Sequence, residues 1–568
     1  MKTTFKKLMA VLLAVTMAMS LFAINASALF DWEDDMFFGS ETVRDNIWYS
    51  LDGETMTATV TGYDIDDEGA SLAPAEVVIP ATVENEGETY TVTEIGFFAF
   101  AECSTVEKIT LPETIVCIND YAFSAAGHLE TVIIPETNEF EYFGTYVFDG
   151  TPAMNYFAEN SADGAVILGK NVLLAYLGNE KSYTVPEEIT IIADYCFFMS
   201  GVEEVILNEN IEEIREFTFA SCRNLKEITV PDSVLYIGEG AFSNCTSLEK
   251  VNLGDCLEAI GIKAFEGTKI KEIYIGEMMY DAAGAFAGCN TLEKITCHED
   301  SMYYMDGETL CVHVEFVDED GTVWIDEDYI EYFMITSDAT SYTVPEDISW
   351  IGNYAFYNCK QLESVTLTTP TVIGSYAFAH CEFDSFDFDK VSGVSMCAFR
   401  SCKNITSANL SNAGFIDDSA FENCTSLAEV TFGDELVYIG SRAFANTAIK
   451  TVDIGGDLNE VSEGAFANCP ELTRANFNDG VWYICTAVFT NCPKLERVYI
   501  AESVEYIEEG AFDGCKNATF EIIKYSYGYD YAEDNDLNYE IVGKVSFFTR
   551  VAKFFTNLFY TLFGWLMF

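Results

Sequence analysis

Basic residues are scarce in this sequence. Lys and Arg number 29 against 93 Asp and Glu, so the formal net charge is −64 at pH 7. Proteins that bind nucleic acids use basic patches to neutralise the phosphate backbone, and this composition argues against that class. The excess of acidic side chains instead favours solubility through mutual repulsion. We therefore expect no nucleic acid among the partners.

The sequence also lacks the common motifs of catalysis. It contains only four histidines, and it has no H-E-x-x-H, no G-x-S-x-G and no phosphate-binding Gly-Lys-Ser/Thr loop. Nucleophilic, metal-dependent and phosphoryl-transfer chemistry each depend on such constellations. We therefore expect no catalytic activity and no cofactor.

Two stretches have the residue types of a metal site without its spacing. The first contains two cysteines and two histidines, which suit tetrahedral zinc but match no common finger: Cys297, His298, Cys311 and His313. A β-hairpin with incidental side chains explains this stretch more simply. The second stretch, 64–69, begins like a calcium loop, but Ala75 stands where that loop needs its glutamate. We expect no dedicated metal site.

The apolar run at the N-terminus is too short to favour a membrane span. Three lysines precede an apolar run over 8–24, and the small-x-small sequence ASA follows at 26–28. This order is typical of a secretory signal peptide that is cleaved after Ala28. We expect residues 1–28 to be removed and the mature protein to be secreted.

A phenylalanine that usually follows alanine recurs through most of the chain. Thirteen of the fifteen steps between its copies are 21 to 25 residues long, and the two longer steps contain insertions. The aligned residues are Phe100, Phe123, Phe148, Phe197, Phe219, Phe242, Phe265, Phe286, Phe356, Phe378, Phe399, Phe421, Phe444, Phe466, Phe489 and Phe512. A catalytic motif needs to occur once, whereas a structural unit gains from repetition, so this spacing indicates a repeat array.

Apolar residues follow each phenylalanine at fixed offsets. After Phe242 these are Leu248, Val251, Leu253, Leu257 and Ile260. The V-x-L segment predicts a short strand with one face inward, the V-x-x-I segment a second strand, and the Ala-Phe segment a turn or brief helix. No copy can bury its apolar side alone, so we predict a repeat solenoid, mainly β, with coils of about 22–23 residues.

The pattern I-G-x-x-A-F-x-x-C-x-x-L-x-x-V-x-L-P resembles the leucine-rich repeats of the BspA-like family of bacterial surface proteins, over roughly 90 to 540. Two long coils end in Y-T-V-P, at 183–186 and 342–345, and the segment 47–63 resembles the hairpin lead-in of such proteins. The resemblance implies a secreted or surface-displayed binding protein that adheres to host or neighbouring-cell proteins. Ligands vary within the family, so no ligand carries over.

The expected domain organisation has four parts. They are a signal peptide (1–28), an N-terminal β-hairpin cap (29–90), a leucine-rich-repeat solenoid (91–542) with insertions near 149–190 and 287–348, and an amphipathic helix (543–568).

The eighteen cysteines invite a disulfide framework, but their positions argue for thiols. Eleven stand three residues after an aligned phenylalanine, and in the other copies this slot holds Ala126, Thr151, Ser200, Thr268 or Thr447. A slot that accepts these types requires a small, buried side chain rather than a covalent partner. Equivalent residues of stacked coils lie roughly 5 Å apart, so bridging stays geometrically possible.

The tail from Gly543 is basic and aromatic, unlike the rest of the chain. Aromatic residues recur at three- and four-residue steps opposite polar ones, which predicts an amphipathic helix. Such a helix suits an anionic membrane interface, and the uninterrupted apolar part from Phe554 is short for a span. A cap over the last coil or self-association are the alternatives. The expected membrane-contact residues are Phe547, Arg550, Lys553, Phe554, Phe555, Phe559, Phe563 and Trp565.

The outward positions of the V-x-L strands are the expected binding surface. They are Lys250, Asn252, Glu429, Thr431, Arg474, Asn476, Arg497 and Tyr499. We expect a non-catalytic cell-surface protein that mediates protein–protein or cell adhesion, with extracellular or host proteins or neighbouring cells as partners. The alternative is a structural envelope or spacer protein whose C-terminal helix contacts the membrane or a partner.

Overall fold

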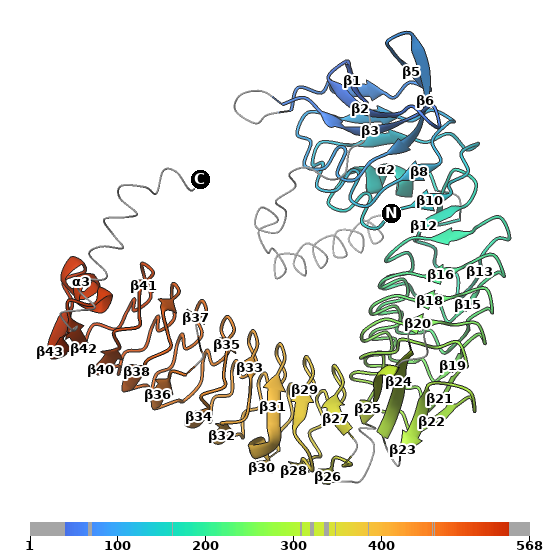
Figure 1. The fold of residues 1–568 in the computed structure, drawn as a ribbon. Helices are drawn as coiled ribbons and strands as arrows, with labels where there is room; N and C mark the ends of the chain where they lie inside the picture. Colours follow the sequence, from blue (N-terminus) through green and yellow to red (C-terminus); the bar gives the residue numbers. More distant parts are fainter. Residues whose placement is uncertain are drawn as a thin grey trace. The chain divides into compact units, whose positions relative to one another are not determined.

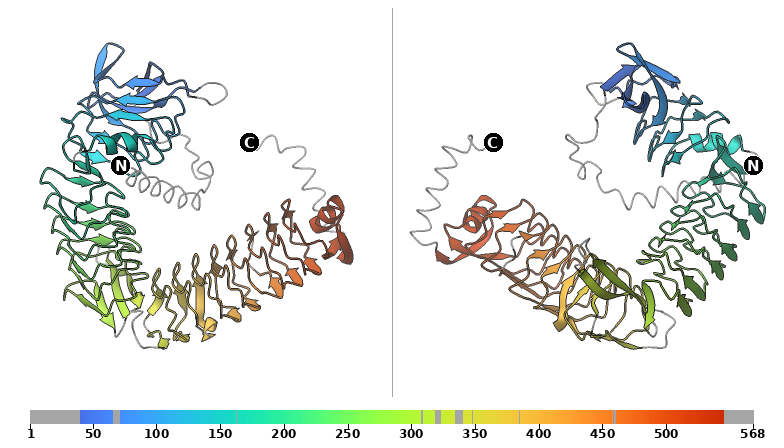
Figure 2. Two further views of the ribbon diagram at one scale, coloured as in Figure 1. Left: turned by 180° about the vertical axis from the view of Figure 1, so that it is seen from behind. Right: turned by 45° about the vertical axis from the view of Figure 1, so that its right-hand side comes forward.

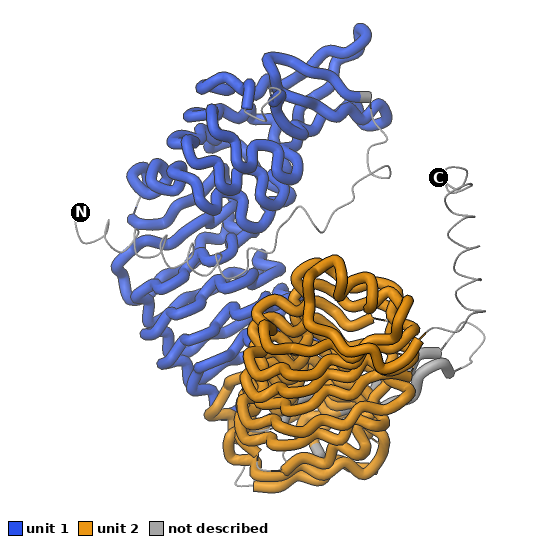
Figure 3. The backbone as a smooth tube through the Cα atoms, turned by 90° about the vertical axis from the view of Figure 1, so that its left-hand side faces the viewer, with its two compact units in different colours: residues 1–281 blue, residues 282–568 orange. Residues whose placement is uncertain are grey.

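The computed structural model describes residues 40–544, apart from 66–70, 162, 307–308, 318–322, 334–339, 347, 384, 457 and 459. The chain divides into two compact units, residues 1–281 and 282–568 (Figure 3). Each unit is a β-solenoid in which short strands dominate and helices are few among the described residues. The predicted fold class is therefore confirmed.

Each coil contributes two short strands and a turn. The V-x-L strand β34 (Glu429–Phe432) and the V-x-x-I strand β35 (Tyr438–Ile439) precede the turn that contains Phe444. We call the V-x-L strands the first row and the V-x-x-I strands the second row. Figures 1 and 2 show both rows along each unit. The described Ala-Phe segments are turns, so the brief helix that we allowed for them is not formed.

Unit 1 contains both rows. Its first row consists of β4 (Glu76–Val78), β7 (Lys108–Thr110), β9 (Thr131–Ile133), β13 (Ser182–Thr184), β15 (Glu204–Ile206), β17 (Glu227–Thr229), β19 (Lys250–Asn252) and β21 (Glu272–Ile275). Its second row consists of β6 (Glu88–Ile95), β8 (Cys117–Ile118), β10 (Tyr142–Phe143), β12 (Val172–Tyr176), β14 (Ile191–Ile192), β16 (Glu213–Ile214), β18 (Tyr236–Ile237) and β20 (Ala259–Ile260). Strands of successive coils pair in parallel within a row, as β17 does with β19 and β16 with β18.

Antiparallel strands precede the first coil of unit 1. They are β1 (Ser40–Arg44), β2 (Ile47–Asp52) and β3 (Thr57–Tyr63), which pair in that order. β3 then pairs in parallel with β6, and β5 (Thr82–Asn85) pairs with β6 in antiparallel fashion. The second-row sheet of unit 1 therefore starts from these hairpins, with β1 as its edge strand.

In unit 2 the first row consists of β22 (Lys294–Cys297), β26 (Ser341–Thr343), β28 (Ser364–Thr366), β30 (Ser385–Phe386), β32 (Ser407–Leu410), β34, β36 (Thr451–Ile454), β38 (Arg474–Phe477), β40 (Arg497–Ile500), β42 (Thr519–Lys524) and β43 (Asn538–Lys544). The second row consists of β27 (Ile348–Ile351), β29 (Thr371–Ile373), β31 (Val391–Val394), β33 (Phe415–Ile416), β35, β37 (Glu460–Val461), β39 (Tyr483–Ile484) and β41 (Tyr506–Ile507). The second row of unit 2 forms one continuous sheet.

Both insertions add antiparallel strands that join the second row. The first contains helix α2 (Ala153–Glu159) and the hairpin of β11 (Ala165–Leu168) with β12, and β12 pairs in parallel with β14. The second contains β23 (Tyr303–Asp306), β24 (Thr309–Val317) and β25 (Val323–Phe333), and β25 pairs in parallel with β27. The Y-T-V segments that follow form β13 and β26, so each returns the chain to the first row.

Among the described residues of unit 2, two segments are helical. The 3-10 helix η2 spans Phe388–Lys390, and α3 spans Tyr527–Asp534, where the Ser526 side chain accepts a hydrogen bond from the Tyr529 backbone. Gly543 and Lys544 belong to strand β43, so the helix expected from 543 does not include them. The rest of that segment, 545–568, lies outside the described residues.

The aligned phenylalanines form stacked columns in the core of each unit. Phe421 has no solvent exposure, and its ring stacks on Phe399 and Phe444 with centroid distances of 5.1 and 5.2 Å. In unit 1, Phe242 stacks in the same way between Phe219 and Phe265, at 5.2 and 5.6 Å. Aromatic pairs of this geometry stabilise beyond the area that they bury.

The turns hold successive coils together by backbone hydrogen bonds. The Phe421 amide donates to the Ala443 carbonyl oxygen at 2.7 Å, and the Asn423 amide donates to the Ala445 carbonyl oxygen at 3.0 Å. Asn423 has φ of 63°, and Asn244 at the same place of another coil has φ of 58°. Asparagine tolerates this left-handed region better than most residues, which explains its frequency before the column cysteine.

A glycine stands four residues before the aligned phenylalanine in seven of the sixteen copies. A Cβ atom on Gly440 would lie 2.4 Å from the backbone nitrogen of Asp418, and one on Gly238 would lie 2.6 Å from that of Glu216. Real Cβ contacts are not this short, so a larger residue at these positions would push neighbouring coils apart. This packing explains the I-G pair of the repeat.

Candidate binding surfaces on the strand rows

The predicted first-row positions face outward in both units. In β19, Lys250 and Asn252 are exposed on either side of the buried Val251. In β34, Glu429 and Thr431 are exposed in the same alternation. The structure thus gives these residues the accessible geometry that a contact requires, in separate stretches of the first row.

Four of the predicted positions lie side by side on β38 and β40. Arg474 is paired in register with Arg497, and Asn476 with Tyr499. Arg474 Nε donates to Asn476 Oδ1 at 2.9 Å. All four are half-buried, because each lies between neighbours of the adjacent strands. This arrangement brings two guanidinium groups together on one face of an acidic protein.

Two glutamates of the next strands hold the arginine pair in place. Glu521 of β42 accepts from Arg474 Nη2 at 2.8 Å and from Arg497 Nη1 at 2.9 Å, and Glu540 of β43 accepts from Arg497 at 3.0 Å. The side chain of Glu521 is 14% exposed, against 42% and 43% for the arginines. Hydrogen bonds to Glu540 and Glu521 raise the pKa of Arg497. The arginines are therefore fixed in orientation while part of each fork stays accessible.

The second row of unit 2 carries exposed aromatic residues that we did not single out from the sequence. Tyr438, Tyr483 and Tyr506 each directly precede the buried isoleucine of their strand and point outward. The Tyr-Ile pair that recurs at this place of the repeat is the sequence pattern that could have identified these tyrosines. Two of these tyrosines donate to carboxylates of adjacent coils, Tyr438 to Asp418 at 3.3 Å and Tyr483 to Glu508 at 2.5 Å.

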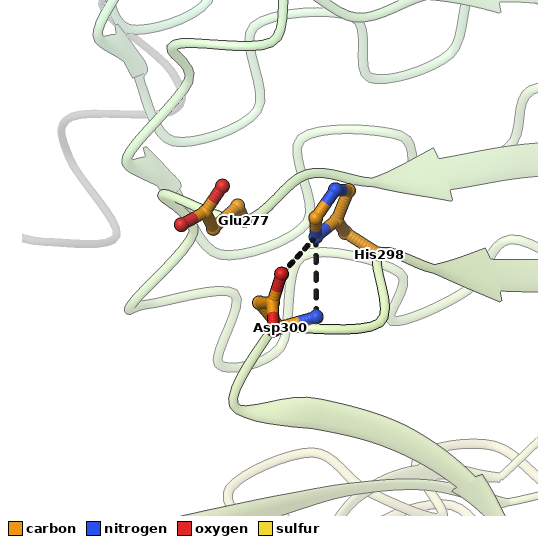
Figure 4. A group of neighbouring side chains, drawn as sticks. All are labelled: Glu277, His298 and Asp300. Atoms are coloured by element: carbon orange, nitrogen blue, oxygen red, sulfur yellow. Dashed lines mark hydrogen bonds and ion pairs between the residues drawn. The ribbon is translucent and has the colours of Figure 1, made fainter.

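The two cysteines and two histidines that have the residue types of a zinc site do not form a common site among the described side chains. Cys297 and Cys311 do not gather with His298 into a group of ligand atoms, and the side chain of His313 lies outside the described part. His298 Nδ1 accepts a hydrogen bond from the Asp300 amide at 3.1 Å (Figure 4). Burial raises the pKa of Cys297 to about 11, which disfavours the thiolate that zinc needs.

The column cysteines are buried thiols that donate to phenylalanine carbonyls. Cys402 Sγ donates to the Phe378 carbonyl oxygen of the preceding coil at 3.0 Å, and Cys424 donates to that of Phe399 at 3.0 Å. The same contact is made by Cys222, Cys245, Cys381, Cys469, Cys492 and Cys515. Burial raises the pKa of Cys424 to about 12. Burial raises the pKa of Cys402 as well, so Cys402 and Cys424 are poor nucleophiles and act as structural residues.

A buried carboxyl group lies next to the first insertion. Burial raises the pKa of Asp194 to about 7, although the positive charge of Arg215 opposes this shift. The Oδ1 atom of Asp194 is buried and has no hydrogen-bond partner among the described residues. Arg215 is itself buried and donates to the carbonyl oxygens of Phe143 and Gly144. Arg215 therefore links the coil before the first insertion to the coils that follow it.

The residues expected to contact a membrane lie outside the described part of the chain. They are Phe547, Arg550, Lys553, Phe554, Phe555, Phe559, Phe563 and Trp565. Within the part that the structure describes, no helix has both the length and the apolar character needed to cross a bilayer.

The repeats match a known family. The family model of the BspA type leucine rich repeat region (6 copies) matches residues 87–161, 170–293, 329–415 and 394–519, which together make up more than half of the chain. No curated protein matches the sequence.

Several solved structures contain similar solenoids. A leucine rich cell surface protein from Faecalibacterium prausnitzii A2-165 is 20% identical, with 88% of this chain and 98% of that chain covered and a TM-score of 0.29. A leucine-rich repeat protein from Bacteroides ovatus ATCC 8483 is 21% identical, with 85% and 100% covered and a TM-score of 0.28. The pneumococcal vaccine antigen PcpA is 15% identical, with 90% and 100% covered and a TM-score of 0.33.

Proposed function

Because the chain belongs to the family of BspA type leucine-rich-repeat proteins, we propose that it is a non-catalytic binding protein of the cell surface or extracellular space. Its partners are extracellular or host proteins, or proteins on neighbouring cells. The signal-peptide pattern of residues 1–28 supports export from the producing cell. Binding then takes place through the ordered outer faces of the strand rows.

The arginine pair on β38 and β40 is the observation that supports this proposal most directly. Arg474 and Arg497 lie in register, and Glu521 fixes both guanidinium groups before any partner arrives. A fixed side chain loses less conformational entropy on binding than a free one does. Arginine and tyrosine are also the residue types that most often dominate interface energetics, and Tyr499 lies on the same strand as Arg497.

The arginine pair indicates the chemistry of the contact. Each guanidinium has five N–H donors, and the two glutamates use only some of them. A carboxylate of a partner can take the remaining donors, whereas a cationic partner would be repelled. We therefore expect this surface to bind an acidic or hydrogen-bond-accepting patch of a partner protein.

A binding experiment with paired variants tests the proposal. The mature chain, residues 29–568, is immobilised and exposed to extracellular matrix proteins and to whole cells. Changing Arg474 and Arg497 together to alanine should reduce capture by about tenfold or more, since each exposed hot-spot arginine contributes at least about 1 kcal/mol. Lys494→Ala is the matched control, because Lys494 is an exposed cation that pairs with Glu471 outside the row. Unchanged capture by the double variant would contradict the proposal.

The sequence of the tail supports a second function, as an envelope component. Residues 543–568 are basic and aromatic, and the tail would hold the protein at an anionic membrane interface while the repeats act as a spacer. The two functions differ in what they require. Adhesion depends on the strand rows and survives loss of the tail, whereas anchoring depends on the tail alone.

A further inference from the structure

An exposed aromatic cluster lies near the C-terminal end of the second row in unit 2. It contains Trp482 directly before β39 and Tyr506 in β41, which are exposed, and Tyr483 in β39 and Tyr527 at the start of α3, which are half-buried. The rings of Tyr483 and Tyr506 stack at 5.1 Å, those of Tyr506 and Tyr527 lie 5.9 Å apart, and Trp482 meets Tyr483 edge to face at 6.1 Å. We call these four residues the aromatic stripe.

The aromatic stripe exposes large apolar surface. Trp482 is 48% exposed and Tyr506 is 46% exposed, although residues of this size are normally buried to a greater extent. Single exposed aromatic residues are ordinary, but contiguous ones mark interaction sites. Strand β39 is paired on both sides within the second-row sheet, whereas β41 is the last strand of that sheet and pairs with β39.

Carboxylates surround the aromatic stripe. Glu508 accepts from the Tyr483 hydroxyl at 2.5 Å and from the Thr486 amide at 2.6 Å. Glu460, which is paired in register with Tyr483, accepts from Cys485 Sγ at 3.2 Å and is exposed. Glu505 is likewise exposed in the residue before Tyr506. Donation of the Tyr483 hydroxyl proton toward a carboxylate makes the ring more electron-rich, which strengthens its attraction for a cation.

We propose that the aromatic stripe binds a lysine- or arginine-rich segment of another protein. The cationic side chains of that segment would lie against the exposed parts of the Trp482 and Tyr506 rings and pair with the exposed Glu460 and Glu505. Two complementary attractions then act on each cation, one from a ring quadrupole and one from a carboxylate. The inference shares with the proposed function only the premise that this protein binds proteins. It concerns the second row instead of the first, and a cationic partner segment instead of an acidic one.

Other occupants fit the surface less well. An acidic segment would be repelled by Glu460, Glu505 and Glu508, and a purely apolar helix would bury these carboxylates without a partner, which is costly. Arginine suits the site better than other cations, because its planar guanidinium both stacks on aromatic rings and forms two hydrogen bonds to a carboxylate.

The test uses the full mature chain and a fluorescent oligo-arginine peptide at an ionic strength of about 0.15 M, where distant charges are screened. Changing Trp482 and Tyr506 together to alanine leaves the net charge unchanged, and it should weaken the anisotropy-derived affinity by roughly tenfold. Changing both to phenylalanine keeps the ring faces and should keep most of the affinity. The control is Tyr274→Ala, which removes an exposed aromatic ring from the first row of unit 1 at the same net charge.

Each outcome bears on the inference. Loss with the alanine variant, together with retention in the phenylalanine variant and in Tyr274→Ala, supports the aromatic stripe as the cation site. Equal binding by the alanine variant and the unmodified chain would show diffuse attraction to an acidic protein and would overturn the inference. Changing Arg474 and Arg497 to alanine should not weaken this peptide, so failure of the proposed function is distinguishable from failure here.

Discussion

Replacement of a single column phenylalanine should uncouple neighbouring coils. In unit 2, Phe421 has no solvent exposure and stacks between Phe399 and Phe444. A solenoid is stabilised by contacts between neighbouring repeats, so the Phe421→Ala variant removes contacts to both sides. Phe512, near the end of the same column, is 8% exposed and stacks on one column member, Phe489, at 5.6 Å. The two positions therefore differ in the number of coil interfaces that they support.

The size of the effect follows from burial and stacking. Truncation of a buried phenylalanine to alanine costs about 3–5 kcal/mol, and a stacked aromatic pair accounts for about 0.5–1.5 kcal/mol of such a loss. We expect about 4 kcal/mol for Phe421→Ala and about 1 kcal/mol less for Phe512→Ala, because one stacked pair is absent there. Phe415→Ala should cost below about 1 kcal/mol, since this ring lies in the second row, half-exposed.

Urea unfolding with hydrogen exchange measures these differences. The change in midpoint, multiplied by the m-value, gives the free energy if the slope is unchanged. Hydrogen exchange adds the location, because repeat arrays need not unfold in one step. Amides of the Phe399 and Phe444 turns should lose protection in Phe421→Ala. A cost below about 2 kcal/mol, or one no greater than that of Phe512→Ala, would refute the view that stacking couples the coils.

Three further predictions concern charge, thiols and the tail. The pKa of Asp194 is about 7 in the folded chain and about 4 in the unfolded chain. Between these pH values the folded state binds one proton more than the unfolded state does. The free energy of unfolding should therefore fall as the pH rises from about 4 to about 7. Asp194→Asn should remove this fall, and equal urea midpoints of the unmodified chain at about pH 5 and pH 7.5 would contradict it. Alkylation of the native protein should label the exposed Cys256 first, with column cysteines such as Cys402 labelled only after denaturation, and disulfide-linked peptides in the untreated protein would disprove the thiol interpretation. Deletion of 545–568 should release the protein from the producing cells into the medium, and unchanged retention after cell fractionation would exclude anchoring by the tail.

The fold could be predicted because every coil repeats the same pattern of apolar residues. The Phe, Leu and Val positions recur at one spacing, so their inward orientation in sixteen copies follows from the period alone. The alternation of V-x-L likewise predicted that residues such as Lys250 and Asn252 face outward, and both are exposed around Val251. A pattern of this kind carries information about periodic contacts, which is the information that a solenoid core requires.

The pairing of charges could not be predicted in the same way. Arg474 and Glu521 are two coils apart, and their ion pair depends on side-chain reach across the intervening Arg497 rather than on the period. The aromatic stripe was missed for a different reason. Tyr483 and Tyr506 occupy a position that other coils fill with Glu460 or Val372, so the column looks variable even though its aromatic members meet in space. Local deviations from a repeat are where function is most readily placed, because the core does not constrain them.

The thiol column shows how a buried polar donor is accommodated in a repeating core. The phenylalanine carbonyl of the turn already accepts from the backbone amide three residues later, as Phe378 does from Cys381 at 3.1 Å, and its second lone pair can take one more donor. Cysteine supplies an S–H to the carbonyl of the preceding coil, as Cys245 does to Phe219 at 3.0 Å. Threonine supplies an O–H to the carbonyl of its own coil, as Thr268 does to Phe265 at 2.8 Å.

Small size alone does not explain the preference for cysteine and threonine at this position, since alanine is smaller. Cysteine and threonine share both compactness and a donor, and valine, which is similar in size to threonine, lacks the donor. A Cys402→Val variant should therefore be less stable than Cys402→Thr by about 1 kcal/mol, the net contribution of one hydrogen bond. Equal urea midpoints of the two variants would show that this position requires only a certain side-chain volume and no donor.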